Sequence, residues 1–220
     1  QSTNNSALIH SPVAISPRKA PLKARLAEEG NRLHTALAPE LDIPFLQNGA
    51  YMLAFDDHEL TTLKTIHREA SRRGLESELL DPASAIEREP RLNPQLKGVL
   101  NMPDAMTANT HDLTRKIANN AIHNGAEVLT EARVRPIDIS KDHFIVMTDK
   151  ASYKARQISN GAGVHTETIA AMVETRVPYS MHPHRGEYYV LGNAYASLTS
   201  HTLFPVPEKD TKGILVIPQP

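Results

Sequence analysis

The sequence predicts an α/β fold in which a helix-and-strand portion is interleaved with an antiparallel portion. Two observations lead to this prediction. Helical patterns alternate with short strands over residues 22–102, and three strand-like runs follow one another over residues 133–159. Alternation in one part and clustered strands in another are typical of such a mixed architecture. With 220 residues the chain is one large domain or two small ones, long enough to bury a core.

The first predicted elements follow a proline-rich loop, because Pro12, Pro17 and Pro21 each fix φ and remove a backbone donor. A helix comes next and ends before Pro44. Its leucines fall on one helical face, at Leu22, Leu26, Leu33, Leu37 and Leu41. Residues 49–55 then read as a strand.

Aspartates mark the starts of the next two helices. Asp56 is a plausible N-cap for a helix that Gly74 closes, and Asp81 precedes Pro82 at the first position of a short helix. Residues 97–102 follow as a strand. The charge run of Glu87, Arg88, Glu89 and Arg91 reads as a solvated face.

The second half begins with a helix over residues 111–124 that Gly125 ends. A small-residue turn, Gly161-Ala162-Gly163, follows the strand cluster and leads into a small helix. The predicted strands of this half are 126–131, 133–140, 143–149, 153–159, 186–191, 201–206 and 213–217.

Composition narrows the function classes. Charge is balanced, with 24 Lys and Arg against 25 Asp and Glu, so a nucleic-acid groove is not expected. No window reaches the 18 or more apolar residues of a membrane span, and no secretory signal is recognisable. The absence of cysteine excludes disulfides and thiolate sites and fits a cytoplasmic protein. We expect both ends to be cut from a longer protein, whose other segments leave peripheral membrane association open.

His10 is the sharpest catalytic candidate, because histidine titrates in the range of a general base. The alternative is a loop histidine satisfied by backbone groups. The turn 161–163 lets a backbone pass close to a ribitol or pyrophosphate, and the next helix offers unpaired N–H groups. The alternative there is an ordinary tight turn.

Arg185 is the candidate anchor for an anionic substrate, since a guanidinium pairs bidentately with a carboxylate or phosphate. The alternative is an ion pair with Glu187, which shares a strand face with it. Tyr188 or Tyr189 would line the same pocket, or else pack across strands. His182 and His184 lack a third ligand at a recognised spacing, so no metal is expected.

Four stretches, in order along the chain, resemble segments of one flavoprotein family. NNSALIH resembles N-S-G-x-I-H, LKARLAEEGNRL resembles L-K-A-x-L-x-x-E-G-N, and ISNGAGVHTETIA resembles a strand-turn-helix N-x-A-G. HPHRGEYYVL, with residues 201–218, resembles an R-G-E-Y-Y strand and the segment after it. On these stretches the chain is similar to the central part of the D-amino acid oxidase superfamily. The most similar branch is that of anaerobic-type glycerol-3-phosphate dehydrogenases and L-2-hydroxyglutarate oxidases.

The resemblance implies a two-domain flavoprotein with a Rossmann-like domain interleaved with a mixed-sheet substrate domain. Residues 1–44 and 111–170 would form part of the FAD-binding domain, and residues 45–110 and 171–220 the substrate domain. It implies FAD as cofactor, a small anionic 2-hydroxy acid or glycerol 3-phosphate as substrate, and an electron acceptor that stays open. His10 and Arg185 would be catalytic, and Tyr188 would join Arg185 at the substrate. The flavin would be lined by Asn4, Asn5, Ser6, Ile9, Val134, Gly161, Ala162 and Gly163.

The chain departs from the family pattern at several positions, and these departures limit what it can be expected to bind and catalyse. The chain contains no G-x-G-x-x-G, whose glycines bring the backbone to a pyrophosphate. The closing flavin segment would begin just after Pro220. Ser11 and Pro12 replace two glycines, and Ala14 stands where aerobic glycerol-phosphate enzymes carry Arg, which disfavours glycerol phosphate. We therefore expect this chain alone to be inactive, and a non-enzymatic scaffold that has lost its cofactor stays open as the alternative.

Overall fold

The computed structural model describes residues 2–174, 176–207 and 213–220. Residues 208–212 of the predicted segment 201–218 therefore lie outside the described residues. The chain divides into two compact units, called unit 1 (residues 1–124 and 189–220) and unit 2 (residues 125–188). The predicted division into cofactor and substrate domains concerns which residues bind which group, and it stays a prediction.

Unit 1 is built around a four-stranded mixed sheet in the order β10-β3-β5-β4. Its strands are β3 (Ala50–Ala54), β4 (Glu78–Leu80), β5 (Gly98–Met102) and β10 (Thr202–Pro205). β3 and β4 run antiparallel to β5, whereas β10 runs parallel to β3. The predicted strands at 49–55, 97–102 and 201–206 are thereby confirmed.

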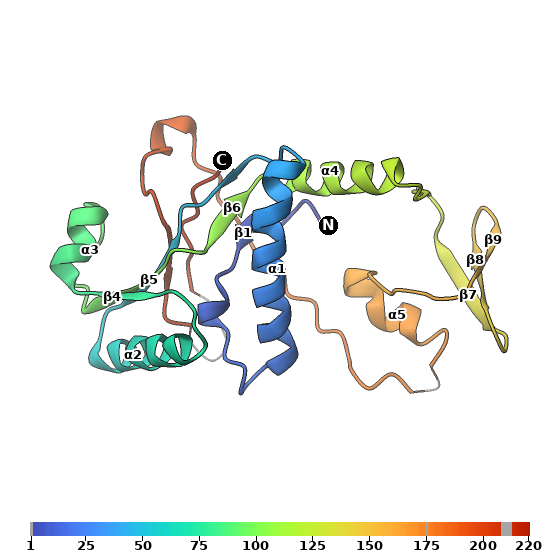
Figure 1. Ribbon diagram of the computed structural model, residues 1–220, viewed down its shortest axis with the longest axis horizontal. Coiled ribbons are helices and arrows are strands. Elements are labelled where there is room, and N and C mark those ends of the chain that lie inside the picture. Colours follow the sequence, from blue (N-terminus) through green and yellow to red (C-terminus); the bar gives the residue numbers. More distant parts are fainter. Residues whose placement is uncertain (1, 175, 208–212) are drawn as a thin grey trace. The chain divides into compact units, whose positions relative to one another are not determined.

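Side-chain alternation gives this sheet two buried faces. Met52 and Leu100 pack against Leu63 of α2 (Asp57–Arg72), which lies along one face in Figure 1. Tyr51 and Val99 point to the other face. There they pack with residues of α3 (Pro82–Arg88) and the loop after it: Ala85, Leu92 and Leu96.

The expected helix caps are present. The Asp56 carboxylate accepts from the Glu59 amide at 2.7 Å, and the Asp81 carboxylate accepts from the Ser84 amide at 3.0 Å. Each bond satisfies one of the amides that a helix N-terminus leaves unpaired. The sequence prediction of both helix starts is confirmed.

A second, three-stranded sheet of unit 1 has the order β1-β6-β2 and is antiparallel. Its strands are β1 (Leu8–Ile9), β6 (Met106–Ala108) and β2 (Phe45–Leu46). The chain leaves β1 into a 3-10 turn, η1 (Pro12–Ala14), and then enters α1 (Pro21–Glu40); β6 leads into α4 (Thr110–His123). Strands of two or three residues carry too little pattern to be predicted from sequence.

The leucine face of α1 is not its buried face. Leu22, Leu26 and Leu33 are 60%, 53% and 50% exposed. The residues that turn inward are small or polar and recur every three or four positions: Ala24, Ala27, Asn31, His34 and Ala38. Small side chains let the helix backbone approach its neighbours closely, which leucines would prevent.

Unit 2 contains an antiparallel sheet in the order β7-β8-β9, formed by β7 (Val134–Ile139), β8 (Phe144–Thr148) and β9 (Ser152–Ala155). These strands confirm the predicted cluster. After them come η2 (Gly163–His165) and α5 (Thr166–Ala170). Mixed helix and sheet throughout both units confirm the predicted fold class.

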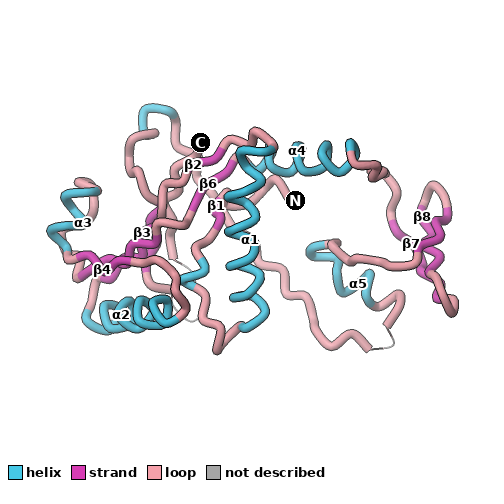
Figure 2. Tube along the Cα trace, in the orientation of Figure 1, coloured by secondary structure: helices cyan, strands magenta, loops and turns pink. Residues whose placement is uncertain are grey.

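Three predicted strands are wrong. Residues 126–131 and 186–191 have no strand structure, and within 213–217 only Val216 forms a bridge, to Leu203 (Figure 2). Alternating apolar residues form a strand only where a neighbour completes the hydrogen-bond ladder. Near residues 186–191 the single regular element is the short turn η3 (Asn193–Tyr195).

Among the described residues, no helix combines the length and the apolar character needed to cross a bilayer.

Candidate functional site

The segment 4–11 is fixed at its start by hydrogen bonds. The Thr110 hydroxyl donates to the Thr3 carbonyl at 2.7 Å. The Asn5 amide donates to the Ser2 carbonyl at 2.8 Å, and the Asn5 side-chain oxygen accepts from the Ala7 amide at 2.8 Å. Asn5 therefore makes the turn that its residue type favours, and its side-chain groups are engaged within the chain.

Ala7 adopts a left-handed backbone, with φ of 62°, although it is not glycine. Its carbonyl accepts from Ala108 at 3.0 Å, and the chain then pairs with β6 through Leu8 and Ile9. Ala7 occupies the glycine position of the N-S-G-x-I-H pattern. The positive φ gives the physical reason for glycine there, since a left-handed φ is costly for other residues.

Two helices hold the backbone around His10. Asn31 of α1 donates to the His10 carbonyl at 3.3 Å and to the Asp104 carbonyl at 2.8 Å. Arg73, at the end of α2, donates to the carbonyls of Pro12 at 3.2 Å and Ile15 at 3.1 Å. The peptide that carries the candidate base is thus placed by long-range contacts.

The surroundings of His10 are mostly apolar. His10 and Ser11 line a narrow internal gap too small to admit water, and the rest of its wall consists of Leu8, Ala14, Ala50, Met102, Ala105 and Phe204. Asp104 lies close by, and burial raises the pKa of its carboxyl while the Ser11 hydroxyl lowers it less. His10 makes a further interaction in addition to the bond at its carbonyl.

Other polar groups of the segment are unengaged. Within residues 2–174, 176–207 and 213–220, the side chains of Asn4 and Ser6 take part in no hydrogen bond. Asn4 is exposed, and Ser6 and Ile9 are half-buried. These side chains can therefore turn to a ligand without breaking an existing bond.

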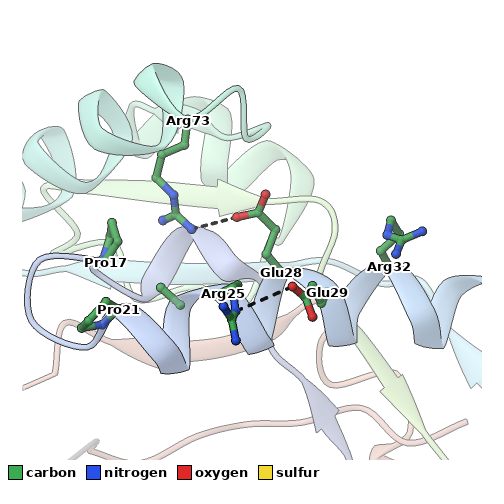
Figure 3. A pocket seen from close by; sticks show the side chains of 8 residues that line it. Pro17, Pro21, Arg25, Glu28, Glu29, Arg32 and Arg73 are labelled. Carbon is green, nitrogen blue, oxygen red and sulfur yellow. Dashed lines mark hydrogen bonds and ion pairs between the residues drawn. The ribbon is translucent and has the colours of Figure 1, made fainter.

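An open groove of about 390 Å³ lies between α1 and the proline-rich loop (Figure 3). Arg73 projects toward Glu28 across it, with the two charged groups 3.4 Å apart, and Arg25 pairs with Glu29 at 3.8 Å. Since four of its five charged side chains are paired with each other, we assign no ligand to this groove.

In unit 2, Val134 opens β7 opposite Thr148. The small-residue turn is held locally: Asn160 donates to the Thr166 carbonyl at 2.9 Å and accepts from Ala162 at 3.2 Å. A Cβ added to Gly161 would meet nothing within 4 Å, whereas Gly163 has a φ of 58°. The open space at Gly161 leaves the backbone approachable by a ligand. The predicted approach of a phosphate group to the N–H groups of the next helix, α5, stays a prediction.

Arg185 is exposed and donates to Glu187 at 3.0 Å, the ion pair that the sequence left open as the alternative. The backbone there is irregular, so this pairing does not depend on a shared strand face. Tyr188 is 58% exposed and Tyr189 is 95% exposed. Neither tyrosine packs across strands.

A buried polar cluster was missed by sequence reasoning. Glu89 is 5% exposed, so its interpretation as a solvated residue was wrong. Its carboxylate accepts from the His201 ring at 2.6 Å, from the amides of Ser200 and His201 at 2.8 Å each, and from the Ser200 hydroxyl. The His201 ring stacks on Tyr51 with centroids 4.0 Å apart. Burial raises the pKa of Glu89, but these hydrogen bonds together hold it below its ordinary value.

No sequence signal marks this cluster, because Glu89 and His201 come from distant segments. Asn31 did carry a signal. It lies in the E-G-N part of the resembling stretch, and it is a polar residue on the small-residue face of a helix. Among the described residues, no group of three or more His, Asp or Glu side chains is arranged to hold a metal.

Comparison with known proteins places the whole chain in one family. Residues 1–220 match the family model described as DAO, FAD dependent oxidoreductase. The chain is 31% identical to glycerol 3-phosphate dehydrogenase of Caloramator mitchellensis, over 97% of this chain and 44% of that protein. It is 25% identical to L-2-hydroxyglutarate dehydrogenase of Escherichia coli, over 94% of this chain and 49% of that protein. The chain thus spans about half the length of these curated relatives.

The fold is shared with a solved flavoprotein. The structure of L-alpha-glycerophosphate oxidase from Mycoplasma pneumoniae with FAD bound superposes with a TM-score of 0.79 at 19% identity. The match covers 99% of this chain and 58% of that one.

Proposed function

The chain belongs to the DAO family of FAD-dependent oxidoreductases, and we propose that it forms part of an enzyme that oxidises a small anionic 2-hydroxy acid or glycerol 3-phosphate. FAD, when bound in the complete protein, supplies the acceptor for a hydride from the carbon that bears the hydroxyl. The observation that carries the proposal is the segment 4–11, whose backbone is fixed while the Asn4 and Ser6 side chains stay unengaged.

Each unit by itself offers groups that a cofactor could contact. In unit 1, Asn4 and Ser6 have unengaged polar side chains, and in unit 2 the open space at Gly161 lets a ligand approach the backbone. We assign the cofactor contacts to Asn4, Asn5, Ser6, Ile9, Val134, Gly161, Ala162 and Gly163. For Asn5 the contact would come from its backbone, because its side-chain oxygen and nitrogen are both used in the turn.

His10 is assigned as the group that accepts the proton of the substrate hydroxyl. Asn31 holds the backbone carbonyl of His10 and Arg73 holds that of Pro12, so the His10 ring projects from a fixed stretch of backbone. Placing a base within hydrogen-bond reach is a requirement of general base catalysis.

Arg185 is assigned to the substrate anion, with Tyr188 beside it. Its present ion pair is exposed on both sides, with side-chain exposures of 86% and 72%. Such pairs contribute little to stability, so exchanging Glu187 for a substrate carboxylate or phosphate costs little. Ala14, in place of the arginine of aerobic glycerol-phosphate enzymes, favours the 2-hydroxy acid.

The test is an FAD titration of the complete protein, followed by the quenching of flavin fluorescence. Gly161→Val is compared with Gly192→Val, because neither added Cβ meets any atom within 4 Å and neither glycine needs a positive φ. We expect Gly161→Val to weaken FAD binding by at least tenfold and Gly192→Val to leave it unchanged. Equal affinities would remove Gly161 from the cofactor site. A complete protein that binds no FAD would favour the non-enzymatic scaffold.

We also propose that this chain alone turns over no substrate, because it lacks the glycine motif for the pyrophosphate. Substrate-dependent flavin reduction by the 220-residue chain would contradict this.

A further inference from the structure

Asn31 connects three parts of unit 1 with one amide group. Its nitrogen reaches the His10 carbonyl at 3.3 Å and the Asp104 carbonyl at 2.8 Å. The two carbonyls follow β1 and precede β6, two strands that pair with each other. Asn31 itself lies in the middle of α1, on the inward face of small residues.

The chemistry of this position requires a double donor. Two backbone carbonyls converge on it, and each one offers only acceptor lone pairs. A primary amide supplies two N–H groups from one nitrogen. An aspartate has the same shape but no N–H group, so its oxygen would face the two carbonyl oxygens without a donor between them. A leucine of similar volume would leave both carbonyls without a hydrogen bond.

Each neighbour of His10 is fixed by a different contact. Ile9 pairs with Met106 before it, and Ser11 after it accepts from the Val13 amide at 3.1 Å and caps η1. Arg73 holds the carbonyls of Pro12 and Ile15 further along. The bond from Asn31 acts on the His10 peptide itself.

We propose that Asn31 is a positioning residue for His10: by binding the His10 carbonyl it fixes the peptide from which the imidazole projects. The proposal rests on the assignment of His10 as the base. Asn31 touches neither the reacting atoms nor the cofactor in this role. Because the same amide binds the Asp104 carbonyl, α1 and the turn before β6 set the position of the base together.

The first test needs no catalysis. In the 220-residue chain, the imidazole resonances of His10 are followed by NMR in wild type, Asn31→Asp and Asn31→Leu. We expect the His10 resonance to move in both variants, while that of His58, exposed on α2, stays in place. A His10 signal unchanged in both variants would overturn the proposal.

Asn101→Asp is the matched control. Asn101 lies on β5 in the same unit and donates to Glu78 at 3.3 Å, so a carboxylate there destabilises the fold by like-charge repulsion. We expect it to lower the unfolding midpoint without moving the His10 resonance. A His10 shift in this variant as large as in Asn31→Asp would show a general loss of stability instead of positioning. If Asn31→Asp does not fold, Asn31→Gln, which keeps the amide but displaces it, is measured in its place with the same expectation.

The second test uses the complete protein and a double-mutant cycle. We expect Asn31→Leu to lower kcat by about tenfold to a hundredfold with little change in KM, as misplacement of a catalytic group does. In a His10→Ala background the same substitution should lower kcat no further. An additive loss would overturn the positioning role. If His10→Ala alone leaves kcat unchanged, the proposed function fails, whereas the NMR result still decides whether Asn31 places the ring.

Discussion

In unit 1 the polar groups are held across long stretches of sequence, whereas in unit 2 they are held by their neighbours. Asn31 binds Asp104 over 73 positions, and Glu89 binds Ser200 over 111. In unit 2, Asn160 reaches only 6 positions to Thr166, and Arg185 only 2 to Glu187. Removing one polar group from unit 1 should therefore disturb distant parts, while the same change in unit 2 should stay local.

The apolar core of unit 1 is also more extensive than that of unit 2. Unit 1 contains two clusters of buried side chains on the faces of one sheet. In unit 2 the buried apolar residues are Ile137 and Ala170, within the described part of the chain. Stability and proposed chemistry are thus distributed unevenly, with the candidate base placed in the better-packed unit.

The largest effect should follow a core truncation in unit 1. Leu100→Ala removes a fully buried side chain from the face covered by α2, and it should cost about 2–5 kcal/mol of unfolding free energy. Ile139→Ala on β7 of unit 2, where the side chain is 59% exposed, should change stability by less than about 0.5 kcal/mol. Urea unfolding followed by circular dichroism measures both. Equal losses would break the comparison between the units.

Glu89→Gln should have the next largest effect on the free energy of unfolding. It should also change how that free energy depends on pH. The folded pKa of Glu89 lies below its ordinary value of 4.5, so its stabilisation is present above that pH and is lost as the pH falls through the folded pKa. At neutral pH the neutral amide should cost about 1.5–3 kcal/mol, because four donors lose a charged acceptor. Unfolding curves at pH 7 and at pH values below 4.5 measure this. A wild-type and variant difference that stays constant over that range would contradict it.

Two backbone substitutions should have smaller effects of opposite sign. Ala7→Gly relieves a left-handed φ in unit 1 and should stabilise by up to about 1 kcal/mol. Gly163→Ala introduces the same strain in unit 2 and should destabilise by about 1 kcal/mol. Thermal unfolding of the pair gives both signs in one experiment. A destabilised Ala7→Gly would mean that chain entropy outweighs the strain at this position.

Arg185→Ala should have the smallest effect on folding, below about 0.5 kcal/mol, because its ion pair is exposed. In the complete protein the same variant should raise KM for the anionic substrate by more than tenfold, since a charged hydrogen bond to the substrate is lost. Lys64→Ala, which removes an exposed cation from α2, is the control for a general charge effect. An unchanged KM would remove Arg185 from the substrate site.

Helices with local signals could be predicted from the sequence, and contacts over distance could not. Asp56 and Asp81 marked helix starts because a cap is a bond to an amide three residues on. The strand pattern of residues 186–191 failed because strand formation depends on a partner. The leucines of α1 indicated the wrong buried face, because the small residues beside them pack more closely.

The candidate site divides in the same way. His10 and the turn at residues 161–163 were found from residue type and resemblance, and their roles stay predictions. Asn31 and Glu89 were not found as site residues, because each acts on a segment that the fold alone brings near. A local sequence motif indicates a candidate catalytic residue such as His10 more readily than a residue such as Asn31, which contacts it from a distant segment.

The most direct test of the proposed enzyme is anaerobic reduction of the flavin in the complete protein. L-2-hydroxyglutarate and glycerol 3-phosphate are added in turn, and the absorbance of the oxidised flavin is followed. We predict that the protein purifies with FAD and that one of the two compounds bleaches it, with bleaching slowed at least a hundredfold in His10→Ala. A protein that holds no flavin, or a flavin that neither compound reduces, would contradict the proposal.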